Sequence, residues 1–268
     1  MMKRRAAVAG QFYHGTNSKL KEQVQEYTDT DLPREEAVGI VVPHAGLIYS
    51  GGVAGAVYSS IIPPRTFVML GPNHTGLGAR AALMDEGEWE IPTGTVGVDR
   101  RLASKIALDN PIVSRDAQAH FFEHSLEVQL PFVVRLSPEI RIVPVALLSL
   151  TVGECLELGR SIAAAVKAVD YPVVILASSD MSHYQPDKAA RAKDRLAIER
   201  ILDIDPEGLY ETVQRERISM CGYLPVTVML HAARLLGAGS ARLVKYATSG
   251  EVSGDYDSVV GYAGIIIR

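Results

Sequence analysis

Several segments of this chain are unbroken runs of valine, isoleucine and leucine rather than alternations of apolar and polar residues. Residues 38–43, 66–71 and 172–178 are examples. A strand that is apolar on both faces must be covered on both faces, as happens in parallel or mixed sheets flanked by helices. Segments with apolar residues at helical spacing alternate with these runs. The pattern predicts an α/β fold, with one domain spanning residues 1–268 and a central mostly parallel or mixed sheet flanked by helices.

The same patterns place the individual elements along the chain. We expect strands at residues 38–43, 66–71, 79–85, 140–147, 172–178, 241–247 and 259–267. We expect helices at residues 51–61, 99–109, 123–136, 152–169, 187–202, 205–215 and 223–236. In an open α/β sheet the ligand site lies beyond the carboxyl ends of the strands. The residues that follow each expected strand are therefore the first candidates for function.

Composition and charge exclude several classes of protein. A formal net charge of −4 gives no electrostatic case for binding nucleic acid. No apolar stretch is long enough to cross a membrane, and the apolar stretch near the basic N-terminus is too short for a signal peptide. A chain of 268 residues that has its own core does not need a disulfide between its two cysteines. We therefore expect a cytoplasmic protein without a membrane or nucleic-acid partner.

Histidines follow three of the expected strands. His44 follows residues 38–43, and His74 follows residues 66–71 after a Pro-Asn pair. Asp180 and His183 follow the strand at 172–178, within the sequence SSDMSH. An aspartate near a histidine can fix its tautomer and raise its basicity. Small residues beside these positions leave room for a ligand, although a histidine in a loop or a hydrogen-bonded core histidine is the alternative for each.

The two cysteines have different surroundings. Cys155 lies at an apolar position of an expected helix, where we expect a small buried side chain. Cys221 precedes Gly222 and the start of the helix expected at 223–236, where the helix dipole favours a thiolate. Two neutral imidazoles and a thiolate form a suitable set of metal ligands. No CxxC or HExxH sequence is present, so this set would have to be assembled from distant segments.

Other motifs have simpler interpretations. Gly51, Gly52 and Gly55 could cradle a phosphate, but without a dinucleotide fingerprint or a Walker lysine we expect them to serve close packing. Ser178 or Ser179, with Asp180 and His183, could form a hydrolase triad, although no G-x-S-x-G motif surrounds either serine. Three further histidines are expected to have surface or packing roles: His14, His120 and His231.

Five ordered motifs resemble one known family. They are VPHAGLIYSGGVAG, LGPNHTG, EHSLEVQLPF, SSDMSHY and MCGYLPV, and AVAGQFY and YATSG near the two ends fit as well. Together they resemble the Memo family across essentially the whole chain, and that family looks like the class III extradiol dioxygenases, which are non-haem iron enzymes. The resemblance implies a dioxygenase-like α/β fold with one metal site at the strand ends.

Site residues are implied by the resemblance position by position. His44 and His74 match the histidine ligands, and Cys221 matches the third ligand position of Memo proteins. His183, with Asp180 beside it, matches the acid/base position of the dioxygenases. The dioxygenases have a carboxylate where this chain has a thiolate. Because a thiolate is softer and more easily oxidised, it shifts metal preference toward copper or zinc and departs from ring-cleaving chemistry.

These observations lead to one functional hypothesis and two alternatives. We expect a metal-dependent oxidoreductase that holds one transition-metal ion, iron or copper with zinc as an alternative, and that acts on a small-molecule or peptide ligand. Four side chains near the motifs are expected to line the pocket: Tyr49, Tyr184, Tyr223 and His124. For His124 a structural role is the alternative. The competing functions are a non-catalytic binding protein that uses the same cleft and a zinc-dependent hydrolase.

Overall fold

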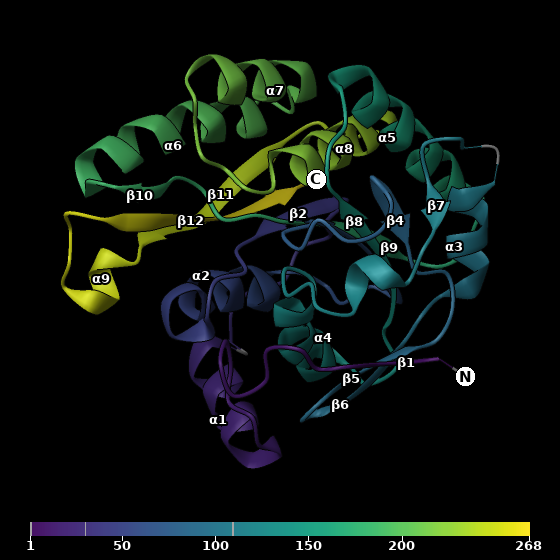
Figure 1. The fold of residues 1–268 in the computed structure, drawn as a ribbon, viewed down its shortest axis with the longest axis horizontal. Helices are drawn as coiled ribbons and strands as arrows, with labels where there is room; N and C mark the ends of the chain where they lie inside the picture. The colour runs from purple at the N-terminus through teal and green to yellow at the C-terminus, as the bar shows by residue number, and fades with distance from the viewer. Residues whose placement is uncertain (1, 30, 109) are drawn as a thin grey trace.

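A computed structural model describes residues 2–29, 31–108 and 110–268. Its main sheet has the strand order β10-β12-β2-β9-β3-β8-β4-β7, and β11 pairs with β12 beside this path (Figure 1). The strands of this sheet are β2 (Gly39–Val42), β3 (Thr66–Pro72), β4 (Ala81–Leu83), β7 (Ser114–Arg115), β8 (Arg141–Leu147), β9 (Val173–Ser178), β10 (His183–Gln185), β11 (Ala241–Thr248) and β12 (Val259–Ile267).

The centre of the main sheet is parallel and its margins are mixed. β2, β9, β3 and β8 run parallel to one another, whereas β12 joins β2 antiparallel and β4 joins β8 antiparallel. All residues of β2 and β3 are buried, as their unbroken apolar runs require. The predicted α/β fold with a mixed sheet flanked by helices is confirmed.

Helices cover both faces of the sheet (Figure 1). On one face α8 packs against β2, β3 and β9, with α5 and α7 behind it. On the other face α2 packs against β2, β11 and β12, and it contacts α1 and α4. The helices are α1 (Asn17–Tyr27), α2 (Leu47–Ser60), α3 (Arg100–Ala107), α4 (Leu130–Leu136), α5 (Val152–Lys167), α6 (Asp187–Leu202), α7 (Pro206–Arg215), α8 (Tyr223–Leu235) and α9 (Gly250–Ser253). None of the helices within the described residues has the length and apolar character needed to cross a membrane.

One expected helix begins later than the pattern indicated. Residues 123–126 are not helical; the 3₁₀ turn η2 (Glu127–Gln129) follows them and leads into α4. Pro131 lies in the first turn of α4, where its missing N–H is tolerated. The carboxylate of Glu123 accepts a hydrogen bond from the backbone N–H of Ser125 and so holds this segment in a turn. The prediction of one helix over 123–136 was therefore wrong at its start.

Several short elements had no expected counterpart. A small sheet of β1 (Lys3–Arg5), β5 (Glu88–Ile91) and β6 (Gly94–Gly97) lies beside the main one. The helix α1 and the 3₁₀ turn η1 (Gln118–His120) were also missed. Strands of three or four residues give too few repeats for an alternating pattern to be recognised.

Two glycines of α2 allow a neighbouring helix to approach closely. A Cβ on Gly55 would lie 2.0 Å from the backbone oxygen of Tyr27, and one on Gly51 would lie 2.4 Å from its ring. The C-terminal end of α1 therefore packs directly on α2. The close-packing interpretation is confirmed at these two positions, whereas Gly52 faces only the end of the Lys245 side chain. Cys155 is fully buried on α5, as expected.

Candidate metal centre

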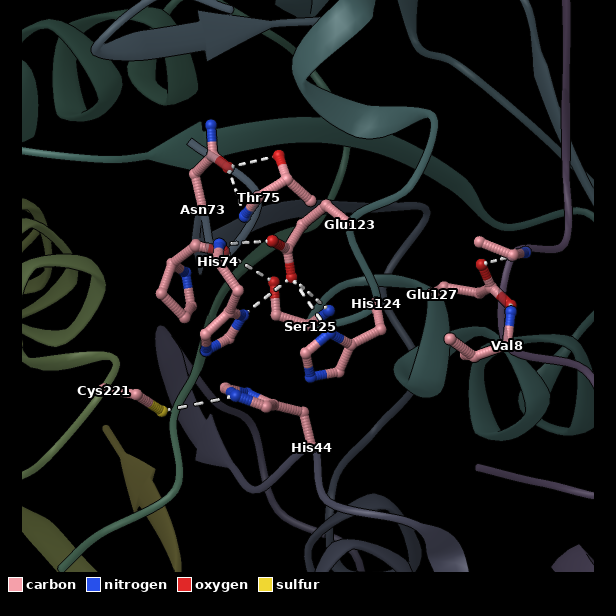
Figure 2. Close-up of polar contacts among 12 residues, drawn as sticks. Val8, His44, Asn73, His74, Thr75, Glu123, His124, Ser125, Glu127 and Cys221 are labelled. Carbon is pink, nitrogen blue, oxygen red and sulfur yellow. Dashed lines mark hydrogen bonds and ion pairs between the residues drawn. The ribbon is translucent and has the colours of Figure 1, made fainter. Parts of the chain in front are cut away.

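Three side chains from distant segments converge beyond the carboxyl ends of the parallel strands. His44 follows β2, His74 follows β3, and Cys221 precedes α8. One ligand atom from each lies within 4.8 Å of those from the other two. The Sγ of Cys221 lies 3.3 Å from Nε2 of His44, and the two imidazole rings are 5.3 Å apart at an angle of 71° (Figure 2). The predicted ligand residues thus lie together.

A glycine brings the third of these side chains to the strand ends. The N–H of Gly222 donates to Oγ of Ser179 at 3.1 Å. A Cβ at Gly222 would lie only 2.3 Å from the backbone oxygen of Ser178, so a larger residue would push this segment away from β9. The close approach places Cys221 beside His44.

The imidazole of His44 is held in one tautomer. Its Nδ1 lies 2.9 Å from Oγ of Ser178. That hydroxyl donates its own hydrogen to the backbone oxygen of Ser125 at 2.7 Å and accepts from the Gln129 amide at 2.9 Å. It can therefore only accept from His44, whose Nδ1 carries the hydrogen. Burial lowers the pKa of His44 well below its ordinary value. The ring is neutral, and its Nε2 lone pair faces Cys221.

The imidazole of His74 is held by a buried carboxylate. Its Nδ1 lies 2.9 Å from Oε1 of Glu123, which also accepts from the N–H of Ser125 at 2.8 Å (Figure 2). Burial raises the pKa of Glu123, but hydrogen bonds from His74 and Ser125 outweigh burial and lower that pKa to about 2. The carboxylate is ionised and acts as an acceptor, so Nδ1 of His74 carries a hydrogen. This leaves Nε2 available as a ligand, the arrangement usual for metal-binding histidines.

The thiol of Cys221 behaves differently from the prediction. Burial raises its pKa, and the nearby carboxylate of Asp180 raises it further. The backbone N–H of Asp180 donates to Sγ at 3.3 Å, which stabilises the thiolate but does not outweigh burial. Without a bound metal, burial therefore outweighs the helix dipole, which was expected to favour the thiolate. A bound cation would have to displace the proton, which couples metal binding to proton release.

The donor set fits a transition metal. Two imidazole nitrogens and one sulfur suit zinc, copper or iron, whereas magnesium and calcium prefer oxygen ligands. A second group formed by His74, Glu123 and His124 also has ligand atoms within 4.8 Å of one another. The oxygens of Glu123 already accept hydrogen bonds from His74 and Ser125. The ring of His124 stacks on His74 with centroids 4.6 Å apart. Glu123 and His124 therefore hold the ring of His74 in place and do not form a second metal site.

Asp180 and His183 do not form the expected hydrogen-bonded pair. Oδ1 of Asp180 accepts from the backbone N–H groups of His44 at 2.8 Å and Ala45 at 3.3 Å. Nδ1 of His183 lies 2.8 Å from the backbone oxygen of Ser219, to which it can only donate. The prediction that Asp180 orients His183 was wrong, because Asp180 instead holds the backbone at the end of β2. His183 keeps its Nε2 as a proton acceptor.

A cavity of about 630 Å³ opens beside His44 and His74, whereas Cys221 does not line it. His124, His183, Tyr49 and Tyr184 line it, as do the unpredicted residues Phe12, Tyr262 and Ser249. Motifs containing Phe12 and Ser249 were visible in the sequence, in AVAGQFY and YATSG, but their residue types alone indicated no role.

Tyr223 lies elsewhere, so its assignment to the pocket was wrong. Its hydroxyl accepts a hydrogen bond from Gln214 at 3.0 Å, and its ring is 5.5 Å from that of Tyr210. As the first residue of α8, it points toward α7 and does not line the cavity beside the ligands.

The geometry leaves neither Ser178 nor Ser179 free to act as a nucleophile. Both Ser178 and Ser179 are fully buried. The hydroxyl of Ser178 donates to the Ser125 carbonyl, and that of Ser179 donates to the Asp180 carbonyl at 2.8 Å. The triad considered from the sequence is therefore wrong. The supporting roles of Ser178, Gln129 and Glu123 were not predicted, because no local sequence pattern connects these residues to the histidines.

The fold and the site together define a class: a mixed α/β protein with a candidate mononuclear metal centre at the carboxyl ends of its parallel strands. A family model described as "Memo-like protein" matches residues 4–266. The chain belongs to the Memo family. It is 41% identical to a MEMO1 family protein of Methanopyrus kandleri, covering 100% of this chain and 99% of that one. It is 42% identical to a MEMO1 family protein of Methanosarcina barkeri, covering 99% and 100%.

A solved structure supports the fold alone. The crystal structure of an uncharacterized protein from Escherichia coli K12 matches with a TM-score of 0.57 at 14% identity. The match covers 85% of this chain and 98% of that chain.

Proposed function

We propose that this protein is a metal-dependent oxidoreductase with one transition-metal ion held by His44, His74 and Cys221. The observation that carries the proposal is the fixed tautomer of both imidazoles. Each Nδ1 donates to a buried acceptor, so each Nε2 lone pair remains available beside the sulfur. Buried partners that orient ligands in this way are typical of metal centres.

We expect the bound ion to be iron or copper, with zinc as the alternative. An ion with three protein ligands keeps positions open for substrate and supplies redox or Lewis-acid chemistry when bound. The protein's own residues would do the remaining work. His183 would accept or return a proton at Nε2, because its Nδ1 is engaged by the Ser219 carbonyl. The aromatic walls formed by Tyr49 and Tyr184 would hold a small molecule or peptide side chain.

The same donors also suit zinc, which makes a zinc-dependent hydrolase the second candidate. Metal analysis of protein purified without added metal separates the two. Iron or copper at about one ion per chain supports the oxidoreductase, and zinc alone supports the hydrolase. We also propose a cytoplasmic location, because both cysteines are free thiols and a reducing compartment keeps thiols in that state.

His183→Ala will retain the metal and lose activity. Nδ1 of His183 faces a backbone carbonyl, and the residue is absent from the converged ligand group. We expect metal content within about twofold of the wild type and turnover reduced roughly 10²–10⁴-fold, the range for a lost general acid or base. Metal analysis and a turnover assay on the same preparation check this. Loss of metal would make His183 a ligand, unchanged turnover would remove its acid/base role, and a wild type without turnover would favour the non-catalytic binding protein.

Cys221→Asp will keep a divalent metal and change which metal is preferred. The carboxylate replaces the softest ligand by a hard oxygen and creates a two-histidine-one-carboxylate set that suits Fe(II). We expect the preference for copper over iron to fall and inactivation by peroxide to slow, because the most oxidisable atom is removed. Competitive loading with iron, copper and zinc, before and after peroxide, measures both effects. Identical behaviour of the two proteins would show that Cys221 does not contact the metal.

A further inference from the structure

A separate, arginine-rich hollow lies at the amino ends of the parallel strands. It measures about 420 Å³ and is lined by four arginines, two aspartates, a tyrosine and a valine. Arg65 directly precedes β3, and Arg141 is the first residue of β8. Both strands have seven residues, so roughly 20 Å separates this hollow from the metal centre at about 3.3 Å per residue. Nothing in the proposed redox chemistry uses these arginines.

Two of the arginines already have carboxylate partners. Arg101 donates to Oδ1 of Asp170 at 3.0 Å, and Arg100 pairs with Glu86 at 3.1 Å. Those two pairs are exposed and contribute little, but they neutralise their own charges. The positive charges of Arg65 and Arg141 are not neutralised by these two pairs.

The remaining carboxylate in the hollow, that of Asp99, is occupied by other donors. It accepts hydrogen bonds from Thr66 Oγ1 at 2.8 Å, the Tyr171 hydroxyl at 2.7 Å and the backbone N–H of Leu102 at 3.1 Å. Burial raises the pKa of Asp99, but these hydrogen bonds and the positive charge of Arg141 outweigh burial and lower it. Asp99 therefore partly balances the charge of Arg141, although it forms no direct ion pair with either Arg65 or Arg141.

Arg65 and Arg141 are neighbours without a carboxylate partner among the described residues. The backbone N–H of Arg141 donates to the Arg65 carbonyl at 3.0 Å, which places the two on adjacent strands. The guanidinium of Arg65 lies over the ring of Tyr171 at 5.1 Å. A Cβ on Gly97 would lie 2.9 Å from Nη1 of Arg141, so the glycine leaves room for that guanidinium. Both side chains are solvent-exposed, so water screens the repulsion between their like charges, and an anion bound between them would be attracted to both.

We propose that Arg65 and Arg141 bind a phosphoryl group, independently of the metal centre. The planar forks of two guanidinium groups match the oxygens of a phosphoryl dianion, and with Arg100 and Arg101 paired with Glu86 and Asp170, the two remaining arginines face the single charge of Asp99. The hollow adjoins a second one of about 880 Å³ that shares both arginines. There is room for the organic part of a phosphate ester as well as for free phosphate.

Direct titration tests this proposal. Calorimetry with inorganic phosphate and with adenosine monophosphate, at constant ionic strength set by chloride, should give saturable binding that acetate does not reproduce. Tighter binding of inorganic phosphate would indicate a site for free phosphate, and tighter binding of adenosine monophosphate would indicate a site for a phosphate ester. The double variant Arg65→Gln/Arg141→Gln should bind at least tenfold more weakly. Gly97→Ala, which retains every charge but displaces the Arg141 guanidinium, should bind several-fold more weakly.

Matched controls distinguish this site from general charge and from the metal centre. Arg195→Gln/Arg215→Gln removes the same charge from arginines paired with Glu199 and Glu216, and should bind phosphate like the wild type. His44→Ala should also bind phosphate normally, so failure of the metal proposal would leave this one intact. The proposal is overturned if neither phosphate binds saturably, or if the Arg65/Arg141 variant binds as tightly as the wild type or no more weakly than the Arg195/Arg215 control.

Discussion

His74→Ala will lower the affinity for a transition metal at least about 100-fold. Loss of a residue that only supports a ligand typically costs 10–100-fold, and loss of the ligand itself should cost more. His74 contributes one of the three converged donor atoms. His124 cannot replace it, because its ring stacks against that of His74 and it is not grouped with His44 and Cys221. Competition against a chelator of known affinity, for iron, copper and zinc in turn, measures the change.

Two further variants make this result specific. Glu123→Gln retains the ligand but removes the charged acceptor that holds Nδ1 of His74, so we expect an intermediate loss of 10–100-fold. His14→Ala removes an exposed histidine outside the site and should have no effect. Wild-type affinity in His74→Ala would contradict the proposed centre, even if metal remains bound to the protein elsewhere.

Glu127→Ala will destabilise the fold by about 3–5 kcal/mol, the cost of breaking a buried ion pair by removing one partner. Arg4 and Glu127 are both fully buried and form a direct ion pair. The carboxylate also accepts from the Tyr13 hydroxyl at 2.5 Å and from the backbone N–H groups of Ala7 at 2.7 Å and Val8 at 3.0 Å. Its loss would leave the buried cation of Arg4 without a counter-charge and would remove the acceptor of the Tyr13, Ala7 and Val8 donors. Denaturant unfolding of the metal-free protein gives the free energy directly.

A surface pair provides the control for this prediction. Glu157 pairs with Arg160 on α5, where both side chains are largely solvated. Glu157→Ala should change the free energy of unfolding by less than about 1 kcal/mol, because exposed ion pairs contribute little. If the two substitutions cost the same, the network around Glu127 does not hold the N-terminal segment in place.

Much of the fold could be predicted because it depends on local patterns. The unbroken apolar runs of β2, β3 and β9 require cover on both faces wherever they lie. Because the carboxyl ends of parallel strands meet at one edge, His44 and His74 could be placed together without knowing any contact. The short strands and the turn at Glu123 could not, because they depend on contacts with distant parts of the chain.

The roles of individual polar side chains were harder to predict. Asp180 lies three residues from His183, yet its carboxylate accepts from His44, which is 136 residues away in sequence. Glu123 interacts with His74 across 49 residues, and Ser178 with His44 across 134. Proximity in sequence suggested the wrong partner for Asp180, because hydrogen bonds depend on distances set by strand order.

The sequence by itself determined the α/β class, the strand ends where the site lies and the residue types that could bind a metal. Those properties follow from hydrophobic periodicity and from the chemistry of histidine and cysteine, which each segment carries with it. Only the tertiary structure decided the tautomers of His44 and His74, the burial that raises the pKa of Cys221 and the position of Tyr223 outside the cavity. These properties depend on burial and on donor and acceptor groups that folding alone brings within hydrogen-bonding distance.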